Sequence, residues 1–146
     1  MFDKERFVKF IKAVELVAPQ GRASMGLVVN KSGLTVPWAE FLTEPMIVEV
    51  DSLANSPNEF IKKLGQAVAG GRRVIMEIKD RLPGELYAQL RSLSMSNRMQ
   101  VANGGEVQDV KLTDARTIVI GLSEVIDRVK KEYPDFVGLF GPVIEV

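Results

Sequence analysis

The sequence contains no cysteine and no histidine. These two absences exclude disulfides, thiolate nucleophiles, imidazole bases and the usual sets of zinc ligands. Ser-His-Asp and Cys-His mechanisms are therefore excluded as well. A chain without cysteine is compatible with a reducing compartment, and we expect a cytoplasmic protein.

Long apolar runs are also absent, and no segment approaches the length that spans a membrane. The charged N-terminal segment MFDKERFVKF is unlike a secretory signal, so we expect no membrane association. Lysine plus arginine equals aspartate plus glutamate at 19 each. The chain therefore has no global field that would attract nucleic acid, and such binding would need a local patch.

The length and composition are those of one ordinary globular domain. The chain has 146 residues, of which 46% are hydrophobic and 26% charged, and a domain of this size buries roughly 70% of its unfolded surface. We find no repeat, low-complexity tract or linker. We therefore expect a single domain over residues 1–146.

Hydrophobic spacing predicts the main elements. Apolar residues at helical intervals predict an amphipathic helix over residues 3–17. Five short runs rich in valine and isoleucine, bounded by glycine, proline or polar clusters, predict β-strands at residues 25–29, 46–50, 73–78, 117–121 and 142–146.

Three further helices are predicted between the strands. In NSPNEFIKKLGQAVAGG, Ser56 is a natural N-cap and Glu59 completes a capping box. PGELYAQLRSL begins at a proline and turns its leucines inward. SEVIDRVKKEY is the third, which we expect Ser123 to cap.

Helices that alternate with nearly all-apolar strands predict a three-layer α/β/α sandwich around a mainly parallel five-stranded sheet. The segment RMQVANGGEVQDVKL instead alternates about Asn103-Gly104-Gly105, a favourable turn sequence. It predicts an antiparallel β-hairpin inserted over about residues 97–112.

This order of elements resembles the core domain of the AAA+ ATPases, which belong to the P-loop class. RRVIMEIKDRLPGELYAQLRSL is similar to the Walker B strand and its helix, ARTIVIGLSE to the first-sensor strand, and YPDFVGLFGPVIEV to the segment that closes the core. The resemblance covers nearly the whole chain but not the helical lid. The sequence ends at Val146, so we expect that the lid was lost or that this is a piece of a longer protein.

The segment NKSGLTVPWAEFL lies where the resemblance places the phosphate loop. Gly33 falls on a loop glycine, but Val36 takes the place of the lysine. Pro37 takes the place of the Mg²⁺-binding hydroxyl and also removes an amide donor.

Lys31 and Thr35 lie near this loop, but on the wrong side of the turn for those roles. Lys31, Gly33 and Thr35 are thus the vestigial cofactor-binding residues, and we expect no cofactor. Trp38, which follows the proline, is expected to fill the space that the relatives leave open for nucleotide.

At the remaining positions of the family's ATPase machinery, this sequence also departs from the family's functional residues. Glu77 and Ile78 fall on the Asp-Glu pair of the Walker B strand, and an isoleucine cannot polarise water. Ser123 holds the position of the sensor asparagine, and Leu139 that of the arginine that serves a neighbouring subunit. We expect no ATP hydrolysis by the family's route.

Two weaker candidate sites can also be interpreted as plain surface features. Asp51 and Glu77, with Asp80 nearby, could hold Mg²⁺ at the carboxyl ends of adjacent strands. The favoured alternative is that these carboxylates are solvated, with Asp80 pairing with Arg81 or capping a helix.

The predicted hairpin could contact nucleic acid through Arg98 and Lys111, together with Arg72 and Arg73. Acidic residues offset these bases, and the hairpin carries no aromatic residue that could stack on a nucleobase. A plain surface hairpin is therefore favoured. The segment FVGLFG could be core or a contact surface between subunits, and we favour core.

The first functional hypothesis is a catalytically inactive P-loop-like domain that acts as a scaffold or regulatory module, through a protein partner or as a homo-oligomer. The alternatives are a nucleic-acid-associated module that uses the hairpin, and a Mg²⁺-dependent nucleotide-hydrolysing enzyme.

Overall fold

The structure is a computed structural model of the chain. It describes residues 3–15, 25–50, 62, 63, 66, 73–96, 98–103, 106–111 and 117–146. Among these residues, no helix is both long and apolar enough to cross a bilayer.

A five-stranded sheet forms the centre of the fold, in the order β2-β3-β6-β1-β7. Every neighbouring pair in it is parallel, which confirms the predicted sheet. The strands are β1 (Met25–Asn30), β2 (Met46–Val50), β3 (Val74–Ile78), β6 (Thr117–Leu122) and β7 (Val143–Glu145). Each lies within one residue of its predicted position at either end.

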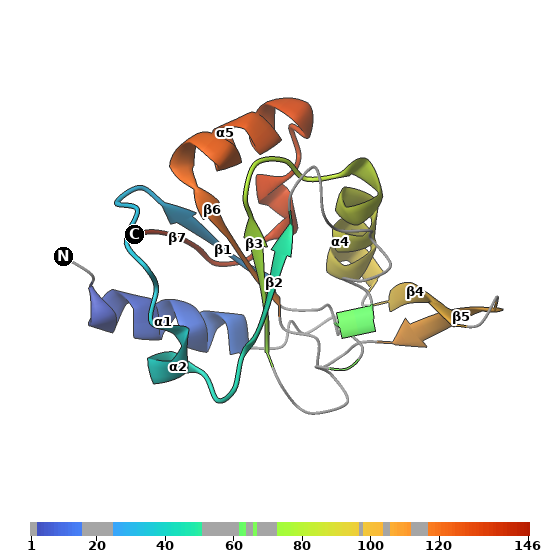
Figure 1. Ribbon diagram of the computed structural model, residues 1–146, viewed down its shortest axis with the longest axis horizontal. Coiled ribbons are helices and arrows are strands. Elements are labelled where there is room, and N and C mark those ends of the chain that lie inside the picture. The colour runs from blue at the N-terminus through green and yellow to red at the C-terminus, as the bar shows by residue number, and fades with distance from the viewer. Residues whose placement is uncertain are drawn as a thin grey trace.

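Helices cover both faces of the sheet, as Figure 1 shows. They are α1 (Lys4–Glu15), α2 (Trp38–Phe41), α4 (Gly84–Ser96) and α5 (Ser123–Glu132), followed by the 3₁₀ helix η1 (Val137–Leu139). Side chains of α4 and α5 share one hydrophobic cluster with one face of the sheet, and those of α1 share a second cluster with the other. This arrangement confirms the α/β/α sandwich.

One prediction about a helix cap is wrong, and one predicted helix lies mostly outside the described residues. Ser123 does not cap α5, because the helix begins at Ser123 with Leu122 as its N-cap, and no side-chain hydrogen bond caps it. The helix predicted at NSPNEFIKKLGQAVAGG lies outside the described residues, except for Lys62, Lys63 and Gln66, which are helical.

The helix α1 packs on β1 and β7 through a row of buried side chains. Phe7 is fully buried, and its ring centroid lies 5.5 Å from that of Trp38 and 4.8 Å from that of Phe41. A Cβ added at Gly26 would lie 2.5 Å from Val14 and 2.7 Å from Phe10. Gly26 therefore permits the close approach of α1 to the sheet.

The predicted hairpin is confirmed as the antiparallel pair β4 (Arg98–Asn103) and β5 (Glu106–Lys111). The core interpretation of FVGLFG is also confirmed. Phe136 and Phe140 are buried in the cluster that α4 and α5 share with the sheet, with ring centroids 5.0 Å apart.

We predict that Gly26→Ala lowers the free energy of unfolding by about 1–3 kcal/mol, because the new methyl group would overlap α1 side chains in a close-packed core. Urea unfolding followed by circular dichroism measures this. Gly138→Ala is the matched control, since an added Cβ there meets nothing within 4 Å. Equal stability of the two variants would contradict the packing account.

Candidate functional site

A hollow of about 320 Å³ lies at the carboxyl ends of the central strands. Its lining comes from the ends of β1, β3 and β6, the loop after β1, and the edge strand β2. The chain leaves β1 toward β2 at one edge of the sheet and leaves β6 toward β7 at the other. The hollow thus lies at a topological switch point, where open α/β sheets commonly bind ligands.

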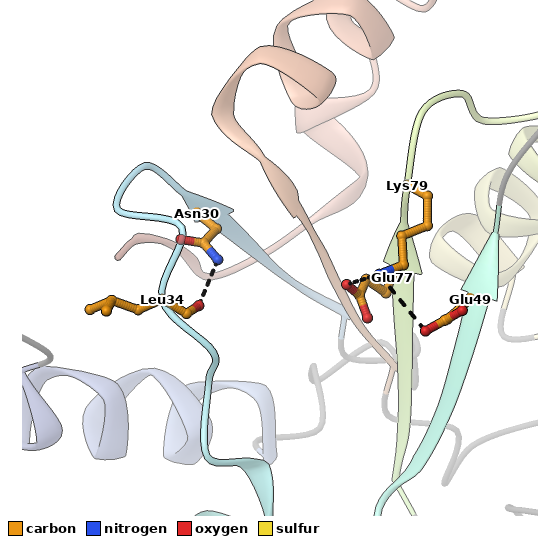
Figure 2. A network of polar contacts seen from close by, with 5 residues as sticks. All are labelled: Asn30, Leu34, Glu49, Glu77 and Lys79. Carbon is orange, nitrogen blue, oxygen red and sulfur yellow. Dashed lines mark hydrogen bonds and ion pairs between the residues drawn. The ribbon is translucent and has the colours of Figure 1, made fainter.

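The loop after β1 is closed by the side chain of Asn30, which is buried. Its Oδ1 accepts a hydrogen bond from the Gly33 amide at 2.9 Å, and its Nδ2 donates to the Leu34 carbonyl at 2.9 Å. Figure 2 shows the second of these bonds across the loop. Gly33 has a φ of 73°, in the left-handed region that glycine adopts at no steric cost. Asn30 thus fixes a tight turn where the resemblance places a phosphate loop.

The two amides before Gly33 are also occupied. The Lys31 and Ser32 amides donate to the main-chain oxygen of Val146 at 2.7 and 3.1 Å. A phosphate loop binds its ligand through N–H groups that point at the phosphate oxygens. Here the amides of three consecutive residues, Lys31 to Gly33, bond to protein acceptors, so none can reach a phosphate without breaking a native hydrogen bond.

The structure separates the three residues predicted as a vestigial cofactor site. Gly33 and Thr35 line the hollow, but Lys31 is not among its lining residues. The Lys31 ammonium lies 2.9 Å from the Glu145 carboxylate on β7, and this hydrogen bond lowers the pKa of Glu145 below its ordinary value. Lys31 therefore ties the loop to the neighbouring strand.

The residues at the positions of the lysine and the hydroxyl pack inward. Val36 and Trp38 are buried in the same cluster as Phe7. The helix that follows, α2, has four residues, and Pro37 precedes it with no side-chain cap. The Trp38 ring is buried near α1 and forms part of the wall of the hollow, and its place in the space that relatives leave open for nucleotide stays a prediction.

An ion-pair group lies on the β3 side of the hollow (Figure 2). Lys79 Nζ lies 2.7 Å from Glu77 Oε1 and 3.8 Å from Glu49 Oε1. The hydrogen bond to Glu77 raises the pKa of Lys79. The carboxylate that could have held Mg²⁺ thus has an ammonium beside it.

The other half of the predicted metal site, Asp51, lies outside the described residues. Within the described part of the chain, no group of three or more acidic, histidine or cysteine side chains could hold a metal ion. Arg81 donates to Glu132 at 3.0 Å.

The structure describes three of the four residues predicted to contact nucleic acid. Arg98 and Lys111 are directly opposite each other at the base of the hairpin. Arg73 precedes β3, at the amino end of the sheet, and its carbonyl accepts from the Met46 amide. Arg72 lies outside the described residues.

Two residues of the site, Asn30 and Lys79, are not among those predicted from the sequence. Asn30 lies at the start of the segment that resembles a phosphate loop, and an asparagine at the start of a turn, here followed by Lys31-Ser32-Gly33, commonly hydrogen-bonds to the main chain that follows it. Lys79 lies just after the end of β3. Its position two residues after Glu77 places both on the same face, which the period of a strand could have indicated.

Comparison with known proteins identifies a similar fold but no family. No protein-family model matches the chain, and no curated protein matches it. Among solved structures, the chain is similar to Hsp104, an AAA+ ATPase, in a closed-state cryo-EM reconstruction with ATPγS and FITC-casein. The TM-score is 0.57 at 13% identity, and the match covers 99% of this chain and 36% of Hsp104. The fold is thus similar to that of part of Hsp104, and the chain spans about a third of the length of that protein.

We predict that Asn30→Ala lowers the free energy of unfolding by about 1–3 kcal/mol, because it removes both side-chain hydrogen bonds that close the loop and leaves the Gly33 amide without its acceptor. Urea unfolding measures the change. Ser32→Ala is the control, since its hydroxyl makes only long contacts of 3.4 Å. An Asn30→Ala protein as stable as Ser32→Ala would mean that the loop does not depend on Asn30.

Proposed function

We propose that this protein is a catalytically inactive, P-loop-like domain that serves as a scaffold or regulatory module through contacts with other proteins. One observation carries the proposal: the Lys31, Ser32 and Gly33 amides, which would cradle phosphate, donate to Val146 and Asn30. The AAA+-like fold keeps the hollow at the switch point, but its loop offers these donors to the protein itself.

Two further features support the absence of catalysis. Val36 stands at the position of the lysine, and its aliphatic side chain is buried in the core. Glu77, at the position of the metal-binding carboxylate, pairs with Lys79 at 2.7 Å. Binding of Mg²⁺-ATP by the family's route would require a cation that is missing and a carboxylate that already has a partner. These features also argue against the alternative of a Mg²⁺-dependent hydrolase.

We expect ATP or ADP at millimolar concentration, with or without Mg²⁺, to leave the melting temperature unchanged within about 1 °C. A nucleotide present at about 100 times its Kd would add about 2.7 kcal/mol, which corresponds to a rise in Tm of roughly 5–10 °C for a chain of this size. Thermal unfolding by calorimetry measures this, with an active P-loop ATPase as positive control. A nucleotide-dependent rise of several degrees, or release of phosphate above the buffer rate, would refute the proposal.

The second candidate is a module that contacts nucleic acid through the hairpin. It is supported by one feature: Arg98 and Lys111 are opposite each other in the register of β4 and β5, so two cationic residues occur at one position along the hairpin.

If the hairpin binds nucleic acid, Arg98→Glu should weaken binding to a labelled single strand by several-fold at low salt and flatten the salt dependence. Fluorescence anisotropy measures both quantities. Lys131→Glu on α5 is the matched charge reversal, and it should leave binding unchanged. Equal losses in both variants would indicate a general charge effect, and no binding by the wild type would dismiss the candidate.

A further inference from the structure

Large apolar side chains are exposed beside the hollow. Among the described residues, five large hydrophobic side chains are exposed, and three of these residues, Leu34, Ile47 and Leu122, also line the hollow. Ile47 is 49% exposed and Leu122 is 43% exposed. They come from the edge strand β2, the end of β6 and the loop after β1. Their gathering at one place distinguishes them from isolated surface hydrophobics.

The strand register places two of them on one face of the sheet. Ile47 is level with Ile75 of β3, and Ile75 is level with Ile118 of β6. Because side chains alternate along a strand, Leu122 lies on the same face as Ile118, and Glu77 on the same face as Ile75. Ile75 and Ile118 are buried, whereas Ile47 and Leu122 are not. Among the described residues, this face is thus covered at its centre, and side chains are exposed at its corner over β2 and the ends of β3 and β6.

The short helix α2 explains the open corner. On this face, α1 packs against β1 and β7, and the connection from β1 to β2 contributes the four residues Trp38–Phe41 as helix. Parallel sheets are normally covered by helices on both faces. A longer helix in this connection would extend over the corner, and α2 is too short to do so.

The charges that line the hollow cancel, and Glu49 of β2, the second partner of Lys79 at 3.8 Å, adds one negative charge beside them. Among its described lining residues, the ionisable groups are Glu77 and Lys79, which are of opposite sign and form an ion pair. A polyanion or polycation would gain little there, so the complementary surface is uncharged. The free energy of docking would come from burying Ile47 and Leu122.

We propose that the corner formed by Ile47, Glu77, Lys79 and Leu122 docks an amphipathic helix of a partner protein, with an uncharged aliphatic stripe against Ile47 and Leu122. This proposal rests on the proposed function and names the partner's chemistry. A helix fits better than a strand, since a strand added beside β2 would reach Ile47 but not Leu122, which lies two strands away. Ile47 is level with Ile118, four residues before Leu122, so a helix laid obliquely across this face from β2 to the end of β6 contacts both.

The test titrates the ¹⁵N-labelled full chain with two synthetic peptides by NMR. In the first, leucines form a stripe at helical spacing, with equal numbers of lysine and glutamate elsewhere. The second has the same composition with the leucines scrambled. We expect the first peptide to shift the amide signals of Ile47, Glu77 and Leu122 saturably, with an affinity roughly tenfold or more above that of the second. That affinity should be unchanged by high salt.

Two variants locate the binding. Ile47→Ser and Leu122→Ser should each weaken binding of the striped peptide by about tenfold. Both side chains are exposed, so neither change removes a core contact, and circular dichroism checks the fold. Val143→Ser on β7 is the matched control, because Val143 is 46% exposed but does not line the hollow. It should bind like the wild type.

Several outcomes would overturn the proposal. They are equal binding of the two peptides, loss of binding in high salt, shifts confined to other surfaces, or an undiminished affinity in both serine variants. Self-association in sedimentation velocity that Ile47→Ser abolishes would assign the corner to a second copy of the chain instead. Failure of the peptide while nucleotide still does not bind would refute this inference alone. Displacement of the peptide by ATP would refute the proposed function as well.

Discussion

The hydrogen bonding of the loop after β1 is the constraint on which the functional account depends. A main-chain amide can donate one good hydrogen bond, and here the Lys31 and Ser32 amides donate to Val146 while Gly33 donates to Asn30. Each hydrogen bond contributes only modestly to the free energy of unfolding, but leaving an amide without an acceptor destabilises the protein by more than that contribution. A phosphate would have to displace all three acceptors. Because residue 36 is a valine and not a lysine, no cation at that position would offset the free energy lost. The loop is therefore stable in its closed form.

The same loop accounts for the shape of the site. Because Asn30 turns the chain tightly and Val36 and Trp38 pack toward α1, the connection to β2 contributes only the short helix α2. The hollow and the exposed side chains of Ile47 and Leu122 lie where a longer helix would otherwise cover the sheet. In our account, the closed conformation of the loop after β1 has two consequences. It leaves no free amides for phosphate, and it leaves the apolar corner exposed.

The sequence was a good guide to the fold because valine-rich runs and helical spacing report directly on burial. The strand positions, the hairpin and the burial of Phe136 were all predictable. The cap of α5 was not, because Ser123 could either precede the helix or begin it. The site was harder to predict. The bonds from Lys31 and Ser32 to Val146 join residues far apart in sequence, and the packing of Trp38 near Phe7 depends on how α1 crosses the sheet.

The most direct test of the central claim observes the loop amides themselves. Two-dimensional ¹H–¹⁵N NMR of the full chain can follow the Lys31, Ser32 and Gly33 signals while Mg²⁺-ATP is added to millimolar concentration. Our account predicts that the three signals stay in place, because their protons remain bonded to Val146 and Asn30. Saturable shifts of these three amides would show that the loop opens to hold phosphate, and would contradict it.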